Sequence, residues 1–278
     1  MIMNGKELAS KIKKNLLEKV AKMEQKPGLV VIQVGSDPAS SIYVKSKAKL
    51  ATEIGFHFEH LTFPDDVTEA ELIAKIEELN ENNEIDGMIV QLPIPAHLDS
   101  MKIINKIKPE KDIDGLTKLN AGSLLTANTG LVSCTPKGIM TLLAEYKVEL
   151  EGKHVVIVGR SNLVGKPLIS LCLEKNATVT ICHSRTKDLT KFTKEADVLI
   201  VAVGKKDLID GSMVKEGAVV VDVGINRVDN QIYGDVNFET VASVASLITP
   251  VPGGVGPMTT ISLMENVLLS HNMMKKGK

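Results

Sequence analysis

The chain has 278 residues, with 33 Lys and Arg against 34 Asp and Glu, and its formal net charge is −1. This near-neutral balance, together with five Phe, three Tyr and no Trp, argues against the basic or aromatic surface that a nucleic-acid partner needs. The three cysteines, Cys134, Cys172 and Cys182, show no metal-ligand spacing, so we expect buried thiols in a reducing compartment and no metal site.

Neither a signal peptide nor a transmembrane segment is expected. Residues 1–14 distribute charges through an amphipathic pattern and lack the apolar core of a signal peptide. The longest apolar runs, such as 29–34 and 218–221, have the length of buried strands and are far too short to span a bilayer. We therefore expect a soluble cytoplasmic protein with no membrane partner.

The first half of the chain alternates in the order helix, strand, helix, strand, helix, strand. We expect helices over 5–23, 38–54, 68–80 and 99–107, and buried strands over 29–34 and 87–91. Asp37 suits an N-cap, Pro38 suits the first helical position, and Gly55 suits a helix end. Strands separated by helices pair in parallel, and ligands bind at the carboxyl ends of such strands. The loops 34–38 and 91–95 are therefore expected at one ligand-binding edge.

Lys47 occupies an unusual place in the predicted helix 38–54. At roughly 100° per residue, an apolar stripe contains Ser40, Tyr43, Val44, Ala51 and Ile54. Lys47 falls in the middle of that stripe, so we expect it to point inward beside Ser40 and Tyr43. A lysine held against apolar surface loses hydration of its charged form and can act as an acid or base near neutral pH. The alternative is that its aliphatic stem snorkels and its ammonium reaches water.

Two further segments have two interpretations each. The charged stretch 108–115 is either a plain connector or a loop that presents the Asp114 carboxylate to the same edge. The glycine- and proline-rich loop 249–260 either docks against a ligand or makes a tight interdomain turn, and it leads into a final helix that ends near His271.

The second half of the chain opens with a helix over 135–146, for which Thr135 is the expected cap. Its other expected elements are strands over 155–158, 177–182, 197–203 and 218–223 and a small hairpin or loop over 229–235. After the first of these strands, Gly159 and Gly165 resemble the glycines of a dinucleotide-binding turn, with amide donors aimed at a pyrophosphate. The match is imperfect, because Ser161 replaces the middle glycine and the span is one residue too long.

The end of the strand 177–182 favours NADP over NAD. NAD-binding units place an acidic residue there for the ribose 2′-hydroxyl, whereas this chain has Ser184 and Arg185, which suit a 2′-phosphate. The alternative is that Arg185 and Lys187 are solvated loop charges.

Taken together, these stretches resemble the bifunctional methylenetetrahydrofolate dehydrogenase/methenyltetrahydrofolate cyclohydrolase family. The resemblance is carried by the stretches 43–47, 91–93, 111–115, 159–161, 164–167 and 249–259. It implies an α/β fold of two domains separated by an active-site cleft. A three-layer N-terminal catalytic domain, 1–118, would be completed by the C-terminal helix 259–278, and a Rossmann-type NADP-binding domain with a parallel sheet would cover 119–258.

The resemblance also implies roles for individual residues. Lys47 would be the principal catalytic residue, supported by Tyr43 and Gln91, and Asp114 would bind the pterin ring. The expected substrate-binding residues are Ser40, Asp114, Pro252, Gly253, Gly254, Pro257 and Thr259. The expected cofactor-binding residues are Gly159, Arg160, Ser161, Gly165, Ser184, Arg185 and Ile225, with Ile225 near the nicotinamide.

The activity implied by the resemblance has two steps. 5,10-Methylenetetrahydrofolate is oxidised with NADP, and the methenyl product is hydrolysed to 10-formyltetrahydrofolate, in one-carbon metabolism and purine biosynthesis. The partners implied are tetrahydrofolate derivatives and a second copy of the chain in a homodimer. Ile94 and Cys134 depart modestly from the family pattern, and neither affects the chemistry.

Two other functions are weighed against this one. A dehydrogenase of the shikimate type also combines a lysine and an aspartate with an NADP domain, and it differs in the loop 249–260. A non-catalytic NADP-sensing protein predicts a broken catalytic constellation, whereas Ser40, Tyr43, Lys47, Gln91 and Asp114 are all present.

Overall fold

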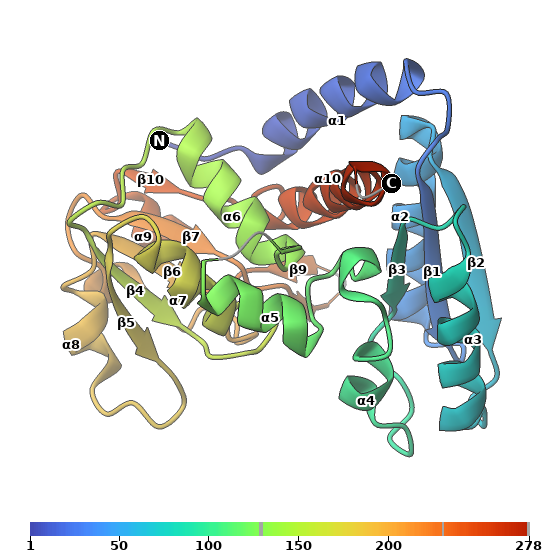
Figure 1. The fold of residues 1–278 in the computed structure, drawn as a ribbon. Coiled ribbons are helices and arrows are strands. Elements are labelled where there is room, and N and C mark those ends of the chain that lie inside the picture. Colours follow the sequence, from blue (N-terminus) through green and yellow to red (C-terminus); the bar gives the residue numbers. More distant parts are fainter. Residues whose placement is uncertain (128–129, 230, 277–278) are drawn as a thin grey trace. The chain divides into compact units, whose positions relative to one another are not determined.

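The computed structural model describes residues 1–127, 130–229 and 231–276, which form two compact units, each built on its own parallel sheet (Figure 1). The three-stranded unit consists of Lys11–Cys134 and Ser262–Lys278. The five-stranded unit consists of Met1–Ser10 and Thr135–Ile261.

The three-stranded unit follows the predicted alternation of helices and strands. Its elements, with a first helix shared between the units, are α1 (Gly5–Ala21), β1 (Gly28–Val34), α2 (Pro38–Ile54), β2 (His57–Phe63), α3 (Glu69–Glu81), β3 (Gly87–Val90), α4 (Ser100–Ile104), the 3₁₀-helix η1 (Pro109–Lys111) and α5 (Lys118–Leu125). The strand order is β2-β1-β3, and both pairings are parallel. The carboxyl ends of β1 and β3 therefore lie at the same edge of the sheet, as predicted.

Strand β1 is buried at every position because helices cover both faces of the sheet. Val30, Ile32 and Val34 share one hydrophobic core with three side chains of α3, namely Leu72, Ile76 and Leu79. On the opposite face α2 contacts β1 and β2 through its own buried side chains. Figure 1 shows α2 and α3 on opposite sides of this sheet, which gives three layers.

The ends of α2 confirm the capping signals in the sequence. Asp37 is the N-cap, and its side chain accepts a hydrogen bond from the backbone N–H of Ser40. Pro38 begins the helix, and Gly55 ends it in the left-handed conformation with φ 94°. A residue with a Cβ adopts that conformation at a cost, so glycine sets the length of the helix.

The five-stranded unit contains the elements predicted for the second half of the chain, together with short helices at 189–193, 211–213 and 238–242 and a short strand at 247–248 that were not predicted. They are α6 (Cys134–Glu145), β4 (His154–Val158), α7 (Gly165–Leu173), β5 (Thr178–Cys182), α8 (Leu189–Thr193), β6 (Val198–Val201), η2 (Gly211–Met213), β7 (Val219–Asp222), β8 (Asn226–Val228), β9 (Gln231–Tyr233), α9 (Phe238–Ala242), β10 (Leu247–Ile248) and α10 (Val255–Lys276), the last shared between the units. The strand order β10-β7-β6-β4-β5 is entirely parallel. Strand β5 pairs with one edge of β4, and the next strand, β6, pairs with the other edge. The strand order therefore reverses at β4, and α/β proteins bind ligands at such a point.

Two helices begin earlier than the sequence predicts. Helix α6 begins at Cys134, and the hydroxyl of the predicted cap Thr135 instead forms a 2.9 Å hydrogen bond with that of Thr259. Helix α10 begins at Val255, so the glycine-proline loop is shorter than expected. Pro257 is accommodated in the first turn of α10, because the N–H groups there have no partner within the helix.

The N-terminal residues pair with the edge of the five-stranded sheet. The backbone N–H of Met3 donates to the carbonyl of Ile248 at 2.8 Å, and the N–H of Ile248 donates to the carbonyl of Met1 at 3.1 Å. These contacts place Met1–Ser10 in the five-stranded unit, whereas the expected catalytic domain began at residue 1. The domain boundaries at 118/119 and 258/259 stay predictions.

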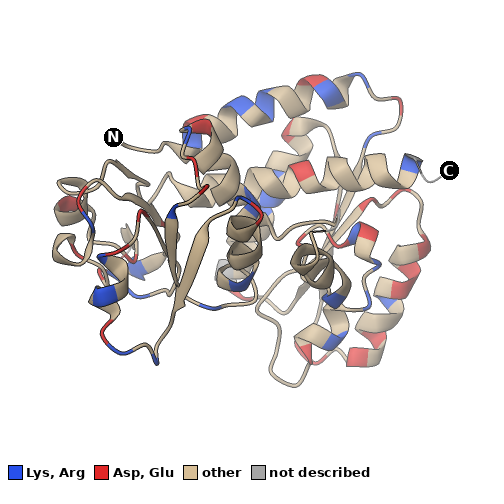
Figure 2. Cartoon of the chain, turned by 60° about the vertical axis from the view of Figure 1, so that its left-hand side comes forward, with Lys and Arg blue, Asp and Glu red and all other residues tan. Residues whose placement is uncertain are grey.

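Charged residues gather on the helices and loops (Figure 2), and β1, β3, β4 and β6 contain none. Strands without charge are typical of parallel sheets that are covered on both faces. Among the described helices, none combines the length and the apolar character that a membrane span requires.

Candidate active site

Lys47 and Gln91 meet at the carboxyl edge of the three-stranded sheet. Lys47 lies on α2, which follows β1, and Gln91 directly follows β3. The Nζ atom of Lys47 donates to Oε1 of Gln91 at 2.9 Å, and Nε2 of Gln91 donates to the carbonyl of Leu92 at 2.7 Å. The second bond fixes which end of the amide faces the lysine. Lys47 is half-buried and Gln91 is buried, so the amine is held in one direction without being sealed from solvent.

The inner face of α2 largely matches the predicted stripe. Four of its five predicted members are buried, namely Ser40, Val44, Ala51 and Ile54. Tyr43 differs from the expectation, because 43% of its surface is exposed. On the helical wheel Tyr43 lies at the margin of the stripe, where a long ring extends past the packed surface. It is therefore accessible to a ligand.

The hydroxyl of Ser40 is a buried polar group without a partner in the described part of the chain. Ser40 is only 3% exposed, and it lies on the same face of α2 as Lys47. Buried hydroxyls are nearly always hydrogen-bonded, since leaving one unpaired costs free energy. A ligand group that bonds to this oxygen would remove that cost.

The two carboxylates of the stretch 111–115 have different surroundings. Asp112 is buried and accepts hydrogen bonds from the N–H of Thr117 and from Nδ2 of Asn120, while burial raises its pKa. Asp112 also forms a parallel bridge to Met88 of β3. After Asp112 the chain turns, with the N–H of Gly115 donating to the carbonyl of Asp112 at 2.9 Å, and Asp114 lies in this turn. Asp114 is partly exposed, so its carboxylate is open to a ligand.

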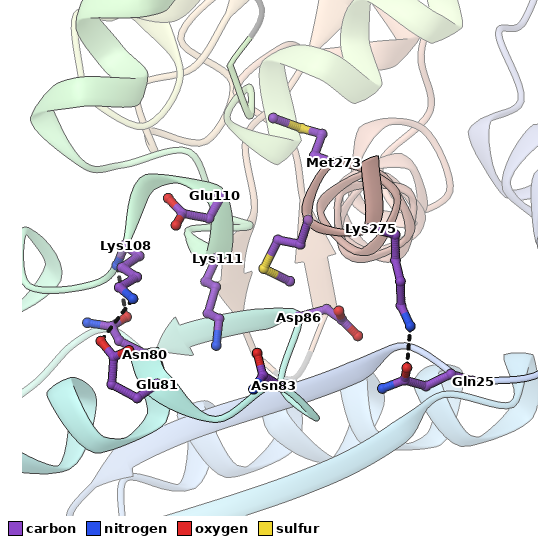
Figure 3. A pocket seen from close by; sticks show the side chains of 11 residues that line it. Gln25, Asn80, Glu81, Asn83, Asp86, Lys108, Glu110, Lys111, Met273 and Lys275 are labelled. Carbon is purple, nitrogen blue, oxygen red and sulfur yellow. Dashed lines mark hydrogen bonds and ion pairs between the residues drawn. The ribbon is translucent and has the colours of Figure 1, made fainter. Parts of the chain in front are cut away.

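Lys111 lies away from this edge. It lines a pocket of about 510 Å³ beside the amino ends of β1 and β3, together with residues from the ends of α3 and α10 (Figure 3). Its Nζ atom donates to the carbonyls of Leu79 and Asn82 at 3.0 and 2.7 Å, and burial lowers its pKa. These carbonyls belong to the C-terminal end of α3, so Lys111 caps that helix.

Two glycines shape the turn between β4 and α7 in the five-stranded unit. Gly159 has φ 123°, and a Cβ atom there would lie 2.2 Å from the carbonyl oxygen of Ala202. A Cβ atom on Gly165 would lie 2.1 Å from the carbonyl oxygen of Gly159. Only glycines permit this close approach of helix and strand, and the resulting cradle of backbone amides fits a dinucleotide pyrophosphate.

The polar residues predicted to hold the cofactor surround this turn. Arg160 and Ser161 are exposed directly after Gly159, and Oγ of Ser161 accepts the N–H of Val164 at 3.1 Å. Strands β4 and β5 are paired in register, so the turn after β5 lies beside the turn after β4. Ser184 and Arg185 are exposed in that second turn. Four predicted cofactor residues therefore occupy neighbouring turns.

The predicted loop residues Pro252, Gly253, Gly254, Pro257 and Thr259 all belong to the five-stranded unit, whereas Ser40 and Asp114 belong to the three-stranded unit. In the loop, Pro252 is exposed and Gly254 is buried. A Cβ atom on Gly5 would lie 1.9 Å from the carbonyl oxygen of Gly254, so the N-terminal segment packs directly on the loop.

Two buried aspartates of the five-stranded unit were missed in the sequence. Asp222 ends β7 and accepts three backbone N–H groups, and burial raises its pKa to about 6. Asp235 follows β9 and accepts four hydrogen bonds. They lie beside Ile225, which is 48% exposed. In the sequence, Asp222 interrupts an apolar stretch and Asp235 ends a turn-like one. This placement was the only sign that either acid is buried.

The cysteines offer no nucleophile. All three are buried, and burial raises the pKa of Cys172 to about 12 and that of Cys182 above its ordinary value. A thiol with such a pKa is protonated at neutral pH, and the thiolate is the reactive form. In the described residues no group of three His, Cys, Asp or Glu side chains is placed to hold a metal ion.

Two family models match the chain in succession. Residues 3–114 match the catalytic domain of tetrahydrofolate dehydrogenase/cyclohydrolase, and residues 133–275 match the NAD(P)-binding domain of the same family. The second match includes the turn at Gly159, where the glycine cradle was found.

Whole-chain relatives agree with these matches. The bifunctional protein FolD of Streptococcus mutans is 53% identical over 269 residues, which are 95% of each chain. The crystal structure of the bifunctional enzyme FolD from Campylobacter jejuni superposes with a TM-score of 0.97, at 45% identity over 99% of each chain. A Trypanosoma brucei FolD structure, complexed with NADP cofactor and an inhibitor, has a TM-score of 0.94 and 36% identity over 99% of this chain and 98% of that one.

A shikimate dehydrogenase is a more distant neighbour. The Thermus thermophilus enzyme, in complex with NADP(H) and shikimate, is 14% identical, with a TM-score of 0.56 over 88% of this chain and 93% of that one. Similarity at this level extends to the fold alone, so it lends no support to a hydroxy-acid substrate.

Proposed function

Because this chain belongs to the tetrahydrofolate dehydrogenase/cyclohydrolase family, we propose that it oxidises 5,10-methylenetetrahydrofolate with NADP and hydrolyses the methenyl product to 10-formyltetrahydrofolate. The observation that carries this proposal is the hydrogen bond between Lys47 and Gln91, on a face that also presents an unpaired Ser40 hydroxyl. A directed amine beside unsatisfied polar groups suits hydrolysis of a cationic substrate.

The first step removes a hydride from the carbon that bridges two folate nitrogens. NADP, when bound at the glycine cradle, would supply the hydride acceptor, and loss of the hydride leaves the folate as a delocalised methenyl cation. Asp114 and Ser40 are proposed to hold the folate during this step. The Asp114 carboxylate is suited to accept hydrogen bonds from the pterin amino group and ring nitrogen, which would orient the bridging carbon.

The second step adds water to the methenyl carbon. Lys47 is proposed to take a proton from the attacking water and then to donate that proton to the ring nitrogen whose bond to the carbon breaks. The remaining hydroxyl proton leaves to solvent as the formyl C=O forms, so one proton is released overall. Gln91 keeps the amine aimed at the carbon, and Tyr43 is proposed to support it with its accessible hydroxyl.

NADP is proposed as the cofactor in preference to NAD. The glycine cradle at Gly159 and Gly165 supplies the pyrophosphate site, with Arg160 and Ser161 at its border. Ser184 and Arg185 occupy the turn after β5, where an acid would favour NAD. Their exposed side chains suit a 2′-phosphate, and Arg can bind it through two hydrogen bonds.

The activity is tested by mixing the purified protein with 5,10-methylenetetrahydrofolate and either NADP or NAD. We expect NADPH absorbance to rise and methenyltetrahydrofolate to appear and then decay, with NAD the poorer oxidant. A parallel assay with shikimate and NADP tests the alternative dehydrogenase. Turnover of shikimate without turnover of folate would reject the proposal, and NADPH binding without any turnover would favour an NADP-sensing protein.

We also infer a homodimer acting in the cytoplasm, whose 10-formyl product serves purine biosynthesis. These inferences rest on the family resemblance. Light scattering of the purified protein measures the oligomeric state directly, and a monomer at assay concentration would contradict the first of them.

A further inference from the structure

The Asp235 carboxylate is fully buried and has four hydrogen-bond donors. Its oxygens accept the backbone N–H groups of Val203, Gly204 and Lys205 at 2.7, 3.0 and 2.7 Å. Oδ1 also accepts Nδ2 of Asn226 at 2.9 Å. Because Gly204 has φ 68°, the three consecutive N–H groups curl into an anion-binding concavity. In this protein the anion in that concavity is an aspartate of the same chain.

A second buried carboxylate fixes the segment that carries Asp235. Asp222 accepts the N–H groups of Gly224, Asp235 and Val236 at 3.0, 2.9 and 3.0 Å. Its own backbone N–H donates to the hydroxyl of Thr249 at 2.7 Å, at the start of the glycine-proline loop. The two carboxylates thus connect the loops that follow β6 and β7 to the loop that precedes α10.

Glycines make room for both carboxylates. A Cβ atom on Gly224 would lie 2.3 Å from Cγ of Asp235, and one on Gly234 would lie 1.7 Å from Oδ2 of Asp222. No side chain fits at either place. The close fit means that neither carboxylate can shift without moving the backbone at Gly224 or Gly234.

The loops held by Asp235 lie at the edge where the cofactor is expected. Residue Ala202, just before the concavity, approaches Gly159 so closely that its carbonyl oxygen would be 2.2 Å from an added Cβ atom. Ile225, between Gly224 and Asn226, is 48% exposed. One carboxylate therefore connects the loop beside the glycine cradle to the loop that presents Ile225.

We propose that Asp235 is a positioning residue for the nicotinamide half of bound NADP, acting through the loops 203–205 and 224–226. The inference rests on the proposed function, which supplies NADP as the ligand. Asp235 is fully buried and acts through these loops rather than by contact with cofactor or substrate. Its hydrogen bonds hold the two loops in place, and the loops in turn position the nicotinamide.

The two activities of the protein separate this role from a merely structural one. Hydride transfer needs a correctly placed nicotinamide, whereas addition of water to methenyltetrahydrofolate needs no dinucleotide. Asp235→Asn preserves shape but turns one acceptor into an NH₂ group that faces N–H donors. We expect dehydrogenase kcat to fall about tenfold to a hundredfold. Cyclohydrolase kcat, measured without NADP, should stay within about twofold because a shared fold is retained.

Asp197→Asn is the matched control. Asp197 also holds the same sheet by accepting a backbone N–H, that of His154 at 2.9 Å, and it pairs with Lys215. It lies at the amino ends of the strands, away from the cofactor edge. We expect this control to leave the ratio of the two activities unchanged.

Equal losses of both activities in Asp235→Asn, or no loss of either, would overturn the proposal. Should that variant fail to fold, Asn226→Ala removes one of the four donors and is expected to lower the dehydrogenase selectively; an unchanged ratio there counts against the proposal equally. A wild-type protein with neither activity would reject the proposed function instead. In that case NADPH fluorescence titration still tests whether Asp235 positions the two loops. We expect weaker or altered NADPH binding in Asp235→Asn, and titrations identical to those of the wild type would overturn the inference.

Discussion

Lys47 and Lys111 are both withdrawn from solvent, but their partners give them different roles. The ammonium of Lys111 is bonded to two backbone carbonyls at the end of α3, which cannot move without unwinding the helix. Lys47 instead donates to the side-chain amide of Gln91, at the carboxyl edge of the sheet. An amine bonded to a side chain can turn toward a substrate, so Lys47 alone of the two is suited to proton transfer.

Replacing Lys47 by methionine tests that role. The Lys47→Met variant keeps the stem and loses the amine, so we expect its rate of methenyltetrahydrofolate hydrolysis to fall at least about a hundredfold. NADPH binding, measured by fluorescence titration, should be unaffected because the residues of the glycine cradle are unchanged. Lys45→Met is the control, since Lys45 lies on the exposed side of the same helix. Hydration at the wild-type rate in Lys47→Met would disprove the assignment.

Lys111→Met tests the capping role. The variant leaves the carbonyls of Leu79 and Asn82 without their donor, so we expect a loss of about 1–3 kcal/mol in the free energy of unfolding. Urea denaturation followed by circular dichroism measures it. Lys108→Met, in the same pocket, removes an exposed ion pair with Glu81 and should change stability little. Equal effects of the two substitutions would contradict the capping role of Lys111.

At the scale of elements, both candidate sites lie where a strand gives way to a helix. The β1–α2 connection brings Ser40 and Lys47 to the carboxyl edge of one sheet, and the β4–α7 connection brings the glycine cradle to the carboxyl edge of the other. In parallel sheets these connections collect at one edge, which explains why residues distant in the sequence meet there.

Gly165→Ala tests how closely α7 must approach β4. The added methyl would meet the carbonyl oxygen of Gly159 at 2.1 Å, so the start of α7 must move away from the turn proposed to bind the pyrophosphate. We expect weaker NADPH binding and a loss of about 1–3 kcal/mol in unfolding free energy. Gly122→Ala, in α5, has open space around the new methyl and should change neither quantity adversely. Unaltered NADPH affinity in Gly165→Ala would argue against a cofactor at this turn.

At the scale of the whole molecule, the buried Asp222 links stability to pH. Burial raises its pKa from 3.8 to about 6, so folding takes up a proton between these values. Its contribution to the free energy of unfolding is greatest below 3.8, declines as pH rises through the window, and is absent above 6. From this group alone we expect stability to be about 1 kcal/mol lower at pH 7 than at pH 5.

Asp222→Asn should abolish that part of the pH dependence. Urea denaturation at pH 5 and pH 7 gives the free energy of unfolding of wild type and variant. The change in this free energy between the two pH values is then compared for the two proteins. Asp197→Asn is the control, because the hydrogen bond from Lys215 lowers the pKa of Asp197 and its titration lies below this range. Identical slopes for wild type and Asp222→Asn would show that the carboxylate does not titrate in the window.

Local patterns in the sequence determined most of the architecture. The alternation of apolar strands with capped helices specified both parallel sheets, and Asp37 with Gly55 specified both ends of α2, because capping depends on residues within one turn. The helical wheel placed Lys47 on the inner face of that helix. Gly159 and Gly165 marked the tight turn between β4 and α7, since only glycine tolerates such close backbone contact.

Only the tertiary structure decided which distant groups became partners. Lys47 became the partner of Gln91, and Lys111 became the partner of the carbonyls at the end of α3. Asp112 was buried, whereas Asp114 stayed partly exposed. The tertiary structure also enclosed Asp222 and Asp235 among backbone N–H groups. The residues next to a side chain in the sequence do not specify which distant residues will donate hydrogen bonds to it. Its burial and its hydrogen-bond partners are decided only when separate elements pack together.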